Sequence, residues 1–400
     1  MNEPPAENEL DTAIRGAVFA RTVADTQEIV QKYRDVLLSD AAEKILAHLQ
    51  EEFGNDEQNG QLLTERLAML KFLLAKSLVH NVLGERAESL ERALDLNQQA
   101  LEVYTRRDYP EHFARTQSDL AYAYLMLGDL RSNTQDIEAA IYHYQEALAV
   151  FTRQDFPADW ARDNARLGAL YRTEDLRGDR AQNLEEAISC FREALKVYTR
   201  RDTPEDWAFV QLGLGDAYCK LLRGDRAHNL EEAVKHLRNA LEVLTHRDFR
   251  EQWGIAQLNL GNAYRDRIRG DRAQNLEEAI NHSQQALEVY TRQESPKDWA
   301  GTKNNLGLAY WQRLRGDRAQ NLEEAISCFR EALEAATRRD FPELWAGIKN
   351  SLALAYRDRI RGDRAQNLEG AINHLQDALD VFTRQGSPEG WARIHVYILI

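Results

Sequence analysis

The sequence predicts an all-α, right-handed superhelical solenoid of antiparallel helix pairs. The first observation is a repeat: the string Gly-Asp-Arg-Ala begins at residues 178, 224, 270, 316 and 362, and a tryptophan recurs at the same 46-residue spacing from residue 207 to residue 391. The second observation is that apolar residues within each half-repeat are three and four residues apart, which is typical of an amphipathic helix. A fixed period built from two helices is the signature of a solenoid, in which each pair packs on its neighbours.

Each repeat is expected to contain two helices. In one repeat, the apolar residues of the first helix are Trp253, Ala256, Leu260, Tyr264 and Ile268. Those of the second helix are Leu276, Ala279, Ile280, Ala286, Leu287 and Tyr290. Both sets fall on one helical face, so the two helices can bury these faces against each other.

The residues between the helices indicate where each helix begins and ends. Six prolines share one register, as Pro296 does, and proline is tolerated in a first helical turn because the N–H there has no intrahelical partner. Ser295, just before that proline, is predicted to cap the first helix. Asn275, followed three residues later by Glu278, is predicted to cap the second helix. Gly270 is predicted to take the left-handed conformation that ends the first helix.

This punctuation divides the chain into a tail, a cap and an array. Residues 1–21, which are acidic and contain Pro4 and Pro5, are predicted to be a disordered N-terminal tail, and residues 22–60 to form N-terminal capping helices. Residues 61–387 are predicted to form seven helix-pair repeats, and residues 388–400 an incomplete C-terminal half-repeat. The seven pairs are expected at about 62–106, 110–153, 157–200, 204–247, 250–293, 296–339 and 342–385.

Composition excludes several classes of function. The 51 Lys and Arg residues face 65 Asp and Glu residues, and the net charge of −14 argues against nucleic acid and against an anionic membrane as partners. No apolar run reaches the roughly 18–20 residues of a membrane helix, and the N-terminus lacks a secretory signal. Three cysteines are too few for a disulfide framework. We therefore expect a cytoplasmic protein in a reducing compartment.

No catalytic site, metal site or cofactor is expected from the motifs. Potential ligand residues recur at one register position, but each belongs to a different repeat, and packed helices lie ~8–10 Å apart, too far for one zinc site. These residues are His143, Cys190, His236, His282, Cys328 and His374. The Glu277–Glu278 pair is expected to serve the start of its helix rather than acid–base chemistry. The five Arg-Gly-Asp strings are expected to be turns rather than adhesion motifs.

The repeats resemble those of the tetratricopeptide-repeat family. That family has Leu-Gly-x-x-Tyr in its first helix, and this chain has the motif beginning at residues 214, 260 and 306. It also has the family's Ala-x-x-x-Phe-x-x-Ala at residues 187–194 and 325–332. The resemblance covers residues 62–400 and implies the solenoid fold, with small residues allowing close helix pairing. The 46-residue period departs from the family's usual length of about 34 residues.

The resemblance also implies a function, which is to bind a protein or peptide in a concave groove lined by the first helices. Asparagine can pair with a peptide backbone and arginine can clamp a carboxylate. Trp311 is the tryptophan that lies outside the repeat register, so packing explains it least. The groove residues implied by the family's positions are Arg162, Arg172, Asn262, Arg265, Asn304, Trp311, Asn350 and Arg357.

Two alternatives to a simple scaffold remain open. The long repeats also resemble arrays that precede caspase-like CHAT peptidase domains in cyanobacteria and other bacteria, which implies a sensor or regulatory arm of a protease or defence system. Alternatively, residues 388–400 carry no polar capping helix, and this edge could stack on a second copy through Ile394 and Ile398 to give a homo-oligomer.

Overall fold

A computed structural model describes residues 57–79, 86–173 and 176–383, together with residues 12, 16, 385, 390–392 and 394. Nearly all of the expected tail at 1–21 and of the expected cap at 22–60, and most of the half-repeat at 388–400, lie outside these residues. In the described ranges the regular secondary structure is entirely α-helical. The all-α prediction is confirmed.

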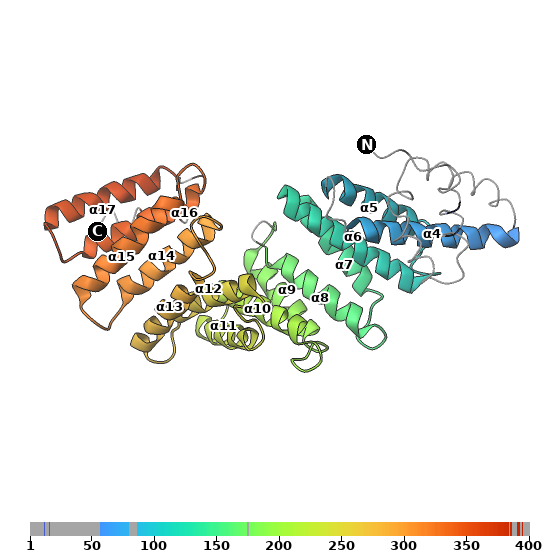
Figure 1. The fold of residues 1–400 in the computed structure, drawn as a ribbon, viewed down its shortest axis with the longest axis horizontal. Helices are drawn as coiled ribbons and strands as arrows, with labels where there is room; N and C mark the ends of the chain where they lie inside the picture. The colour runs from blue at the N-terminus through green and yellow to red at the C-terminus, as the bar shows by residue number, and fades with distance from the viewer. Residues whose placement is uncertain are drawn as a thin grey trace. The chain divides into compact units, whose positions relative to one another are not determined.

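Fourteen α-helices in the described residues form seven consecutive antiparallel pairs (Figure 1). We call the first helix of each pair the A helix and the second the B helix. The pairs are α4 (Glu57–Val79) with α5 (Arg86–Leu101), α6 (Pro110–Arg131) with α7 (Thr134–Leu148), α8 (Pro157–Tyr171) with α9 (Arg180–Ala194), α10 (Pro204–Lys220) with α11 (Arg226–Leu241), α12 (Arg250–Asp266) with α13 (Arg272–Ala286), α14 (Pro296–Gln312) with α15 (Arg318–Ala335), and α16 (Pro342–Asp358) with α17 (Arg364–Leu379).

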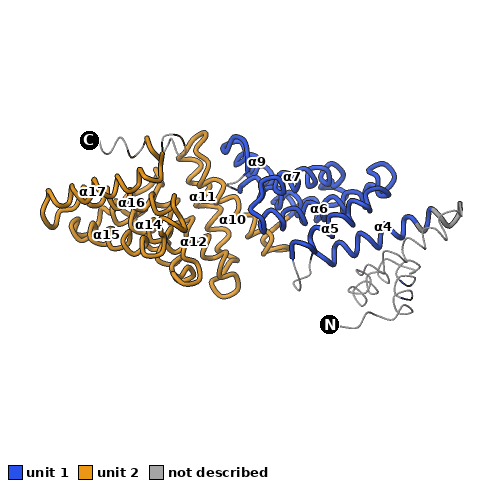
Figure 2. The backbone as a smooth tube through the Cα atoms, turned by 90° about the horizontal axis from the view of Figure 1, so that it is seen from above, with its two compact units in different colours: residues 1–197 blue, residues 198–400 orange. Residues whose placement is uncertain are grey.

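The chain divides into two compact units, residues 1–197 and residues 198–400 (Figure 2). Unit 1 contains α4–α9 and unit 2 contains α10–α17. Within unit 2, α12 contacts both α10 and α14, and α14 contacts α16, so the A helices form one continuous layer. The B helices α11, α13 and α15 each pack against their own A helix and against the A helix of the next pair.

Glycine allows the two helices of a pair to approach closely. A Cβ atom added at Gly307 would lie 2.6 Å from Cε1 of Phe329, and one added at Gly215 would lie 2.4 Å from Cγ of Leu237. Both distances are far below van der Waals contact, so a larger residue would push the helices apart. Phe329 and Leu237 are themselves fully buried, and they fill the space that the glycines leave.

The B helices α9, α11, α13, α15 and α17 are capped by aspartate, so the prediction of an asparagine cap at Asn275 was wrong. Asp271 is the N-cap residue of α13, and its side chain accepts a hydrogen bond from the backbone N–H of Gln274. Asn275 lies in the first turn instead, where its Nδ2 donates to the carbonyl oxygen of Arg269 at 2.8 Å. The aspartate takes the extended backbone that an N-cap requires, and the asparagine closes the loop.

The glycine of each Gly-Asp-Arg string has the predicted positive φ, but it does not end the A helix directly. Gly270 has φ +83°, whereas α12 already ends at Asp266. The end of α12 is completed from the next helix, because the Arg272 guanidinium donates to the carbonyl oxygen of Arg265. A cation at a helix C-terminus is favourable because it faces the negative end of the helix dipole.

Ser295 stands at the N-cap position of α14, but its side chain makes no hydrogen bond to that helix. Its hydroxyl oxygen instead accepts from the backbone N–H of Thr291 at 3.2 Å, within the preceding turn. The prediction of a serine cap is therefore corrected: Pro296, which follows, begins the helix without needing an N–H partner.

Ion pairs connect consecutive repeats of unit 2. The Arg313 guanidinium donates to both oxygens of Glu277, at 2.9 and 2.8 Å, and Arg359 binds Glu323 in the same two-pronged way. Arg313 holds the pKa of the Glu277 carboxyl below its usual value. The expectation that Glu277 only serves the start of its own helix was therefore incomplete, because its partner is 36 residues further along the chain.

Ile394 is buried within the last repeat rather than exposed at an edge. It packs in a core cluster with Ala346, Leu375 and Phe382. An Ile394→Asp substitution would therefore test folding, which corrects its expected role in self-assembly. Ile398, the other residue of that expectation, lies outside the described residues.

Candidate functional site

Six of the eight residues expected to line a groove lie on three neighbouring A helices of unit 2. Asn262 and Arg265 lie on α12, Asn304 and Trp311 on α14, and Asn350 and Arg357 on α16. Asn304 and Trp311 are seven residues apart, which is close to two helical turns, so they share one face of α14. Arg162 lies on α8 in unit 1, and Arg172 is the C-cap residue of that helix.

The three asparagines share an unusual feature. The side-chain oxygens of Asn262, Asn304 and Asn350 are shielded from solvent and accept no hydrogen bond within the described structure. We call these residues the asparagine row. A buried polar atom without a partner destabilises a fold by roughly 1–3 kcal/mol. Three such atoms on consecutive A helices are therefore a cost that packing alone does not explain.

Three of the four predicted groove arginines are already engaged with carboxylates. Arg265 donates from Nε and Nη2 to Asp266, at 2.9 and 3.3 Å, and from Nη1 to Asn305 at 3.0 Å. Arg357 pairs with Asp358 at 2.9 Å. In unit 1, Arg162 pairs with two aspartates of α8, at 2.6 and 3.1 Å. A partner's carboxylate would have to compete with these groups, so the expectation that arginine clamps a ligand is weakened at these positions.

Trp311 is held in one orientation by a hydrogen bond across two A helices. Its indole Nε1–H donates to Oδ2 of Asp358 at 2.9 Å, while the other oxygen of Asp358 accepts from Arg357. Trp311 is half-buried, so part of a large aromatic ring remains accessible at a fixed position. Fixed, partly exposed aromatic rings are common anchors in protein interfaces.

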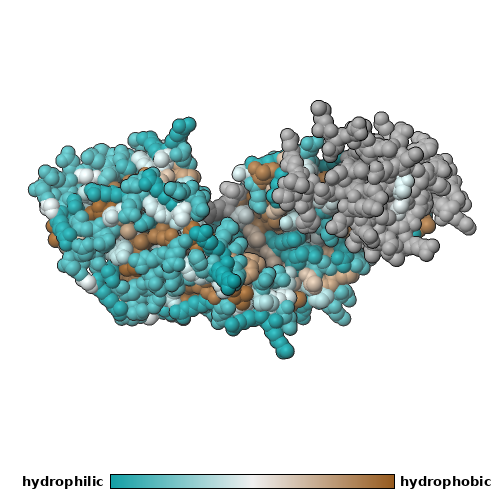
Figure 3. Space-filling view, viewed as in Figure 1, coloured by the Kyte–Doolittle hydropathy of each residue, from teal (hydrophilic) through white to brown (hydrophobic). Residues whose placement is uncertain are grey.

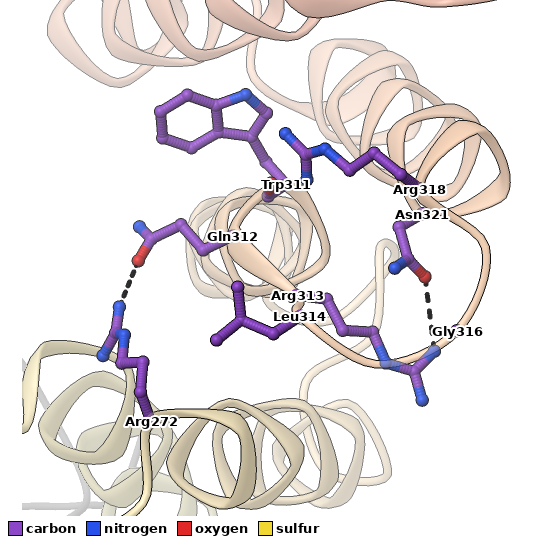
Figure 4. Close-up of a pocket in the computed structure, with 8 residues that line it drawn as sticks. All are labelled: Arg272, Trp311, Gln312, Arg313, Leu314, Gly316, Arg318 and Asn321. Carbon is purple, nitrogen blue, oxygen red and sulfur yellow. Dashed lines mark hydrogen bonds between the residues drawn. The ribbon is translucent and has the colours of Figure 1, made fainter.

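A pocket of about 450 Å³ lies beside Trp311, at the C-terminal end of α14. Trp311, Gln312 and Leu314 extend from the end of this helix, with Arg272 on one side and Arg318 on the other (Figure 4). The pocket wall is completed by Arg313, Gly316 and Asn321. None of these eight residues is acidic. We call this the Trp311 pocket; of its residues, only Trp311 was singled out as a candidate from the sequence.

The surface of unit 2 is largely hydrophilic, with separate apolar patches (Figure 3). Part of its exposed apolar surface comes from one aliphatic residue per repeat, each two residues before the glycine of Gly-Asp-Arg and each at least 60% exposed. These residues are Leu222, Ile268, Leu314 and Ile360. Leu314 is the member of this series that lines the Trp311 pocket.

The recurring His and Cys positions are part of the packing between helices. The imidazole of His282 stacks on Tyr264, with ring centroids 5.5 Å apart, and its Nδ1 lies 2.6 Å from Oε1 of Gln257. His143 stacks on Tyr124 in the same way, and burial lowers the pKa of His143 to about 4. No group of three or more potential metal ligands occurs in the described part of the chain.

Sequence reasoning missed a cluster of buried charge in unit 1. Asp163 is fully buried, accepts a hydrogen bond from the Ser118 hydroxyl and pairs with Arg162, and burial raises its pKa. Nearby, Oδ2 of Asp119 is shielded from solvent without a hydrogen-bond partner. A signal was present in the sequence, because Asp163 stands at the register position of Val210 and other uncharged residues in unit 2.

Comparison with known protein families supports the helix-pair fold. The model of the tetratricopeptide repeat matches residues 121–150, which span parts of α6 and α7. The fold is that of a tetratricopeptide-repeat array. None of the curated proteins compared with the sequence matches it. In the described residues, no helix has the length and apolar character needed to span a bilayer.

Solved structures resemble nearly the whole chain at low sequence identity. The apo form of RapI covers 98% of this chain and 95% of its own length, at 15% identity and a TM-score of 0.50. The anaphase-promoting-complex hetero-tetramer Cut9–Hcn1 covers 98% of this chain and 69% of its own, at 18% identity and a TM-score of 0.49. Yeast Tom70 covers 99% and 82%, at 13% identity and a TM-score of 0.38. The likeness to RapI concerns the fold alone.

Proposed function

We propose that this chain is a non-catalytic interaction scaffold, and that the A-helix face of unit 2 binds a peptide or an extended segment of a partner protein. The asparagine row carries this proposal. Each of its amides has an oxygen that no group of the described structure satisfies, and a turn of the side chain toward the surface would present that oxygen to the N–H groups of an extended peptide. A cost borne in the free protein would then be recovered on binding.

The regular spacing of the row suits an extended ligand. Asn304 and Asn350 occupy the same register position on α14 and α16, and Asn262 lies one turn further along α12. Adjacent A helices are in contact, so the three amides follow one another across the layer. The same surface would serve a free-standing scaffold or, as the resemblance to CHAT-associated arrays implies, the sensing arm of a bacterial protease system.

Alanine substitution separates a binding role from a structural one. We expect Asn304→Ala and Asn350→Ala to leave the urea midpoint of unfolding unchanged or to raise it, because each removes an unpaired buried acceptor. The same variants should weaken peptides that random-peptide phage display selects against the wild-type chain, by about 10-fold each, which corresponds to about 1.4 kcal/mol.

Asn281→Ala is the matched control, because Asn281 is exposed on the B helix α13. It should change neither stability nor peptide binding. Loss of stability in the Asn304 and Asn350 variants without loss of peptide binding would show that the row is structural and would contradict the proposal.

Self-assembly is a second candidate, and an exposed face of α17 favours it. Leu368 and Ile372 are 37% and 47% exposed, whereas their counterparts Leu322 and Ile326 in α15 are almost fully buried under the next repeat. Ile372→Glu should convert a homo-oligomer into a monomer in sedimentation-velocity experiments, while Ile268→Glu, at an exposed site elsewhere, should not. A wild-type chain that is monomeric at all concentrations would exclude this candidate.

A further inference from the structure

The Trp311 pocket is basic in an acidic protein. The chain carries a net charge of −14, yet three arginines and no carboxylate line this pocket. One of the three, Arg313, is neutralised by Glu277. Within the described residues the other two bind only neutral oxygens: Arg272 donates to the carbonyl of Arg265 and the side chain of Gln312, and Arg318 donates to the carbonyl of Trp311.

Two substitutions within the repeat pattern create this environment. The last two residues of α16 and of α12 are an arginine and an aspartate, whereas α14 ends with Trp311 and Gln312. In the preceding repeat, Asp266 lies 4.0 Å from Arg226, the counterpart of Arg272. Gln312 therefore lacks the negative charge of Asp266 and Asp358, and Trp311 places an aromatic ring where α12 and α16 carry an arginine.

We propose that the Trp311 pocket holds an acidic side chain that adjoins a bulky apolar one, both carried by the segment that unit 2 binds. Arg318 uses only Nη1 within the described structure, so its Nε and Nη2 can donate to one carboxylate. Arg272 adds a second positive charge on the opposite side of the pocket (Figure 4). Trp311 and the 65% exposed Leu314 supply an apolar surface between the two guanidinium groups.

The pocket and the asparagine row can be occupied by one segment. Asn304 and Trp311 share a face of α14 and are seven residues apart, which is about 10.5 Å along the helix axis. An extended peptide covers this distance with about three residues. The inference therefore rests on the proposed function, and it adds to that function a preference for an acidic and apolar sequence at one end of the site.

Two synthetic peptides test this preference on the full chain. The first is an acetylated and amidated Gly-Ser-Glu-Leu-Glu-Ser-Gly peptide, and the second has glutamine in place of both glutamates. Fluorescein-labelled versions measured by anisotropy should show the glutamate peptide binding wild type about 10-fold more tightly than the glutamine peptide. Because the contact is ionic, this preference should shrink as salt concentration rises.

Comparison of equivalent positions in the repeats suggests variants that test the pocket and a matched control. Gln312→Asp restores the residue that α12 and α16 carry at this position, so we expect it to fold and to lose the preference for the glutamate peptide. Arg318→Gln should also lose it. Arg364→Gln is the matched control for Arg318→Gln, because Arg364 makes the same bond to the carbonyl of Arg357 but does not line the pocket.

Several results would each overturn the inference. One is equal affinity of wild type for the two peptides, and another is an unchanged preference for the glutamate peptide in Gln312→Asp. A third is displacement of the glutamate peptide by inorganic phosphate at a concentration equal to the dissociation constant of that peptide, which would indicate a site for any anion. Absence of binding by both peptides up to about 1 mM would also overturn it. The proposed function is decided separately: peptides that bind wild type and depend on Asn304, but not on Gln312 or Arg318, would uphold it without the pocket.

Discussion

The α6–α7 pair of unit 1 and the α14–α15 pair of unit 2 differ in the length of the A helix and in the loop that follows it. Helix α6 spans 22 residues and is followed directly by Ser132 and Asn133, whereas α14 spans 17 residues and is followed by the loop Arg313–Asp317. Leu130 of α6 stands at the register position of Gly316. Leu130 lies within its helix, whereas Gly316 lies in the loop after α14, where its φ of +80° is a conformation that favours glycine.

The shorter A helix has a functional consequence. In α14–α15 the early turn exposes Leu314, frees Arg313 to bind Glu277 of the preceding repeat, and opens the Trp311 pocket beside the helix end. The corresponding residues of α6 remain part of a helix, and the family model matches the chain at this pair. The glycine loop of unit 2 therefore contributes both to the Arg313–Glu277 ion pair between repeats and to the Trp311 pocket.

The largest effect is expected from exchanging the small residue between the two pairs. Ala121 of α6 corresponds to Gly307 of α14, so Gly307→Ala tests whether the pairs differ in closeness of packing. The added methyl would lie 2.6 Å from Phe329, and we expect a loss of about 1–3 kcal/mol in urea unfolding followed by circular dichroism. Gly301→Ala, on the same helix with nothing within 4 Å, should instead stabilise by up to about 1 kcal/mol.

Exchanging Leu130 of α6 and Gly316 of the α14–α15 loop should have the next largest effect. Gly316→Leu introduces the α6 residue at a positive φ and should cost about 1–2 kcal/mol in urea unfolding, because a side chain is disfavoured there. Leu130→Gly places glycine within α6 and should cost about 0.5–1 kcal/mol. Equal tolerance of Leu and Gly at residue 316 would contradict the preference for glycine at this φ.

The same register position is His143 in α7 and Cys328 in α15, so the histidine should make the stability of the fold depend on pH. Burial lowers the pKa of His143 to about 4, so the folded state resists a proton that the unfolded state accepts near 6.5. This contribution to stability is complete above 6.5 and is lost as the pH falls from there toward 4. Wild type should therefore lose about 1 kcal/mol more than His143→Cys between about pH 7 and about pH 5 in urea unfolding. The same loss in both proteins would contradict the assignment to His143.

The smallest effect is expected from the ion pair that unit 2 builds between repeats. A double-mutant cycle of Arg313→Gln and Glu277→Gln should give a coupling of about 0.5–1 kcal/mol at neutral pH, since both side chains are partly exposed. Arg313 lowers the pKa of Glu277, so the coupling is present above the ordinary value of 4.5 and is lost as the pH falls through the lowered one. A coupling that stays constant down to about pH 3 would exclude an ionic origin.

Much of the fold follows from the sequence because the signals recur in every repeat. The spacing of apolar residues and the register of the prolines predicted the helices, because a pattern that recurs in several repeats is a stronger signal than one that occurs once. The cap was misassigned because Asn275 and Asp271 are both good N-cap residues, and only the backbone conformation of the loop decides between them. The Arg313–Glu277 pair joins residues 36 positions apart, which a pattern within one repeat does not show.

The candidate site was only partly predictable for a similar reason. The family positions located the asparagine row and Trp311, because register determines which face of an A helix a residue occupies. Register does not determine side-chain partners, so the pairing of Arg265 with Asp266 was not foreseen. The Trp311 pocket depends on Arg272 and Arg318, which begin B helices and come close to α14 only through the loop geometry.

The central claim, that the A-helix face of unit 2 is the binding surface, is tested most directly by site-specific photo-crosslinking. The photoreactive residue p-benzoylphenylalanine would replace Gly301 on α14 or Gly347 on α16, two sites where an added Cβ atom has nothing within 4 Å. Ser327, exposed on the B helix α15, gives the matched control. Irradiation in lysate of the source organism, followed by mass spectrometry, would identify the crosslinked residues of the partner.

We expect crosslinks from residues 301 and 347 to one contiguous segment of a partner, and none to that segment from residue 327. Asn304→Ala in the same background should reduce these crosslinks, because it removes the amide that holds the segment. Crosslinks formed only from residue 327, or formed equally from all three sites, would contradict the claim and would place the binding surface elsewhere on the chain.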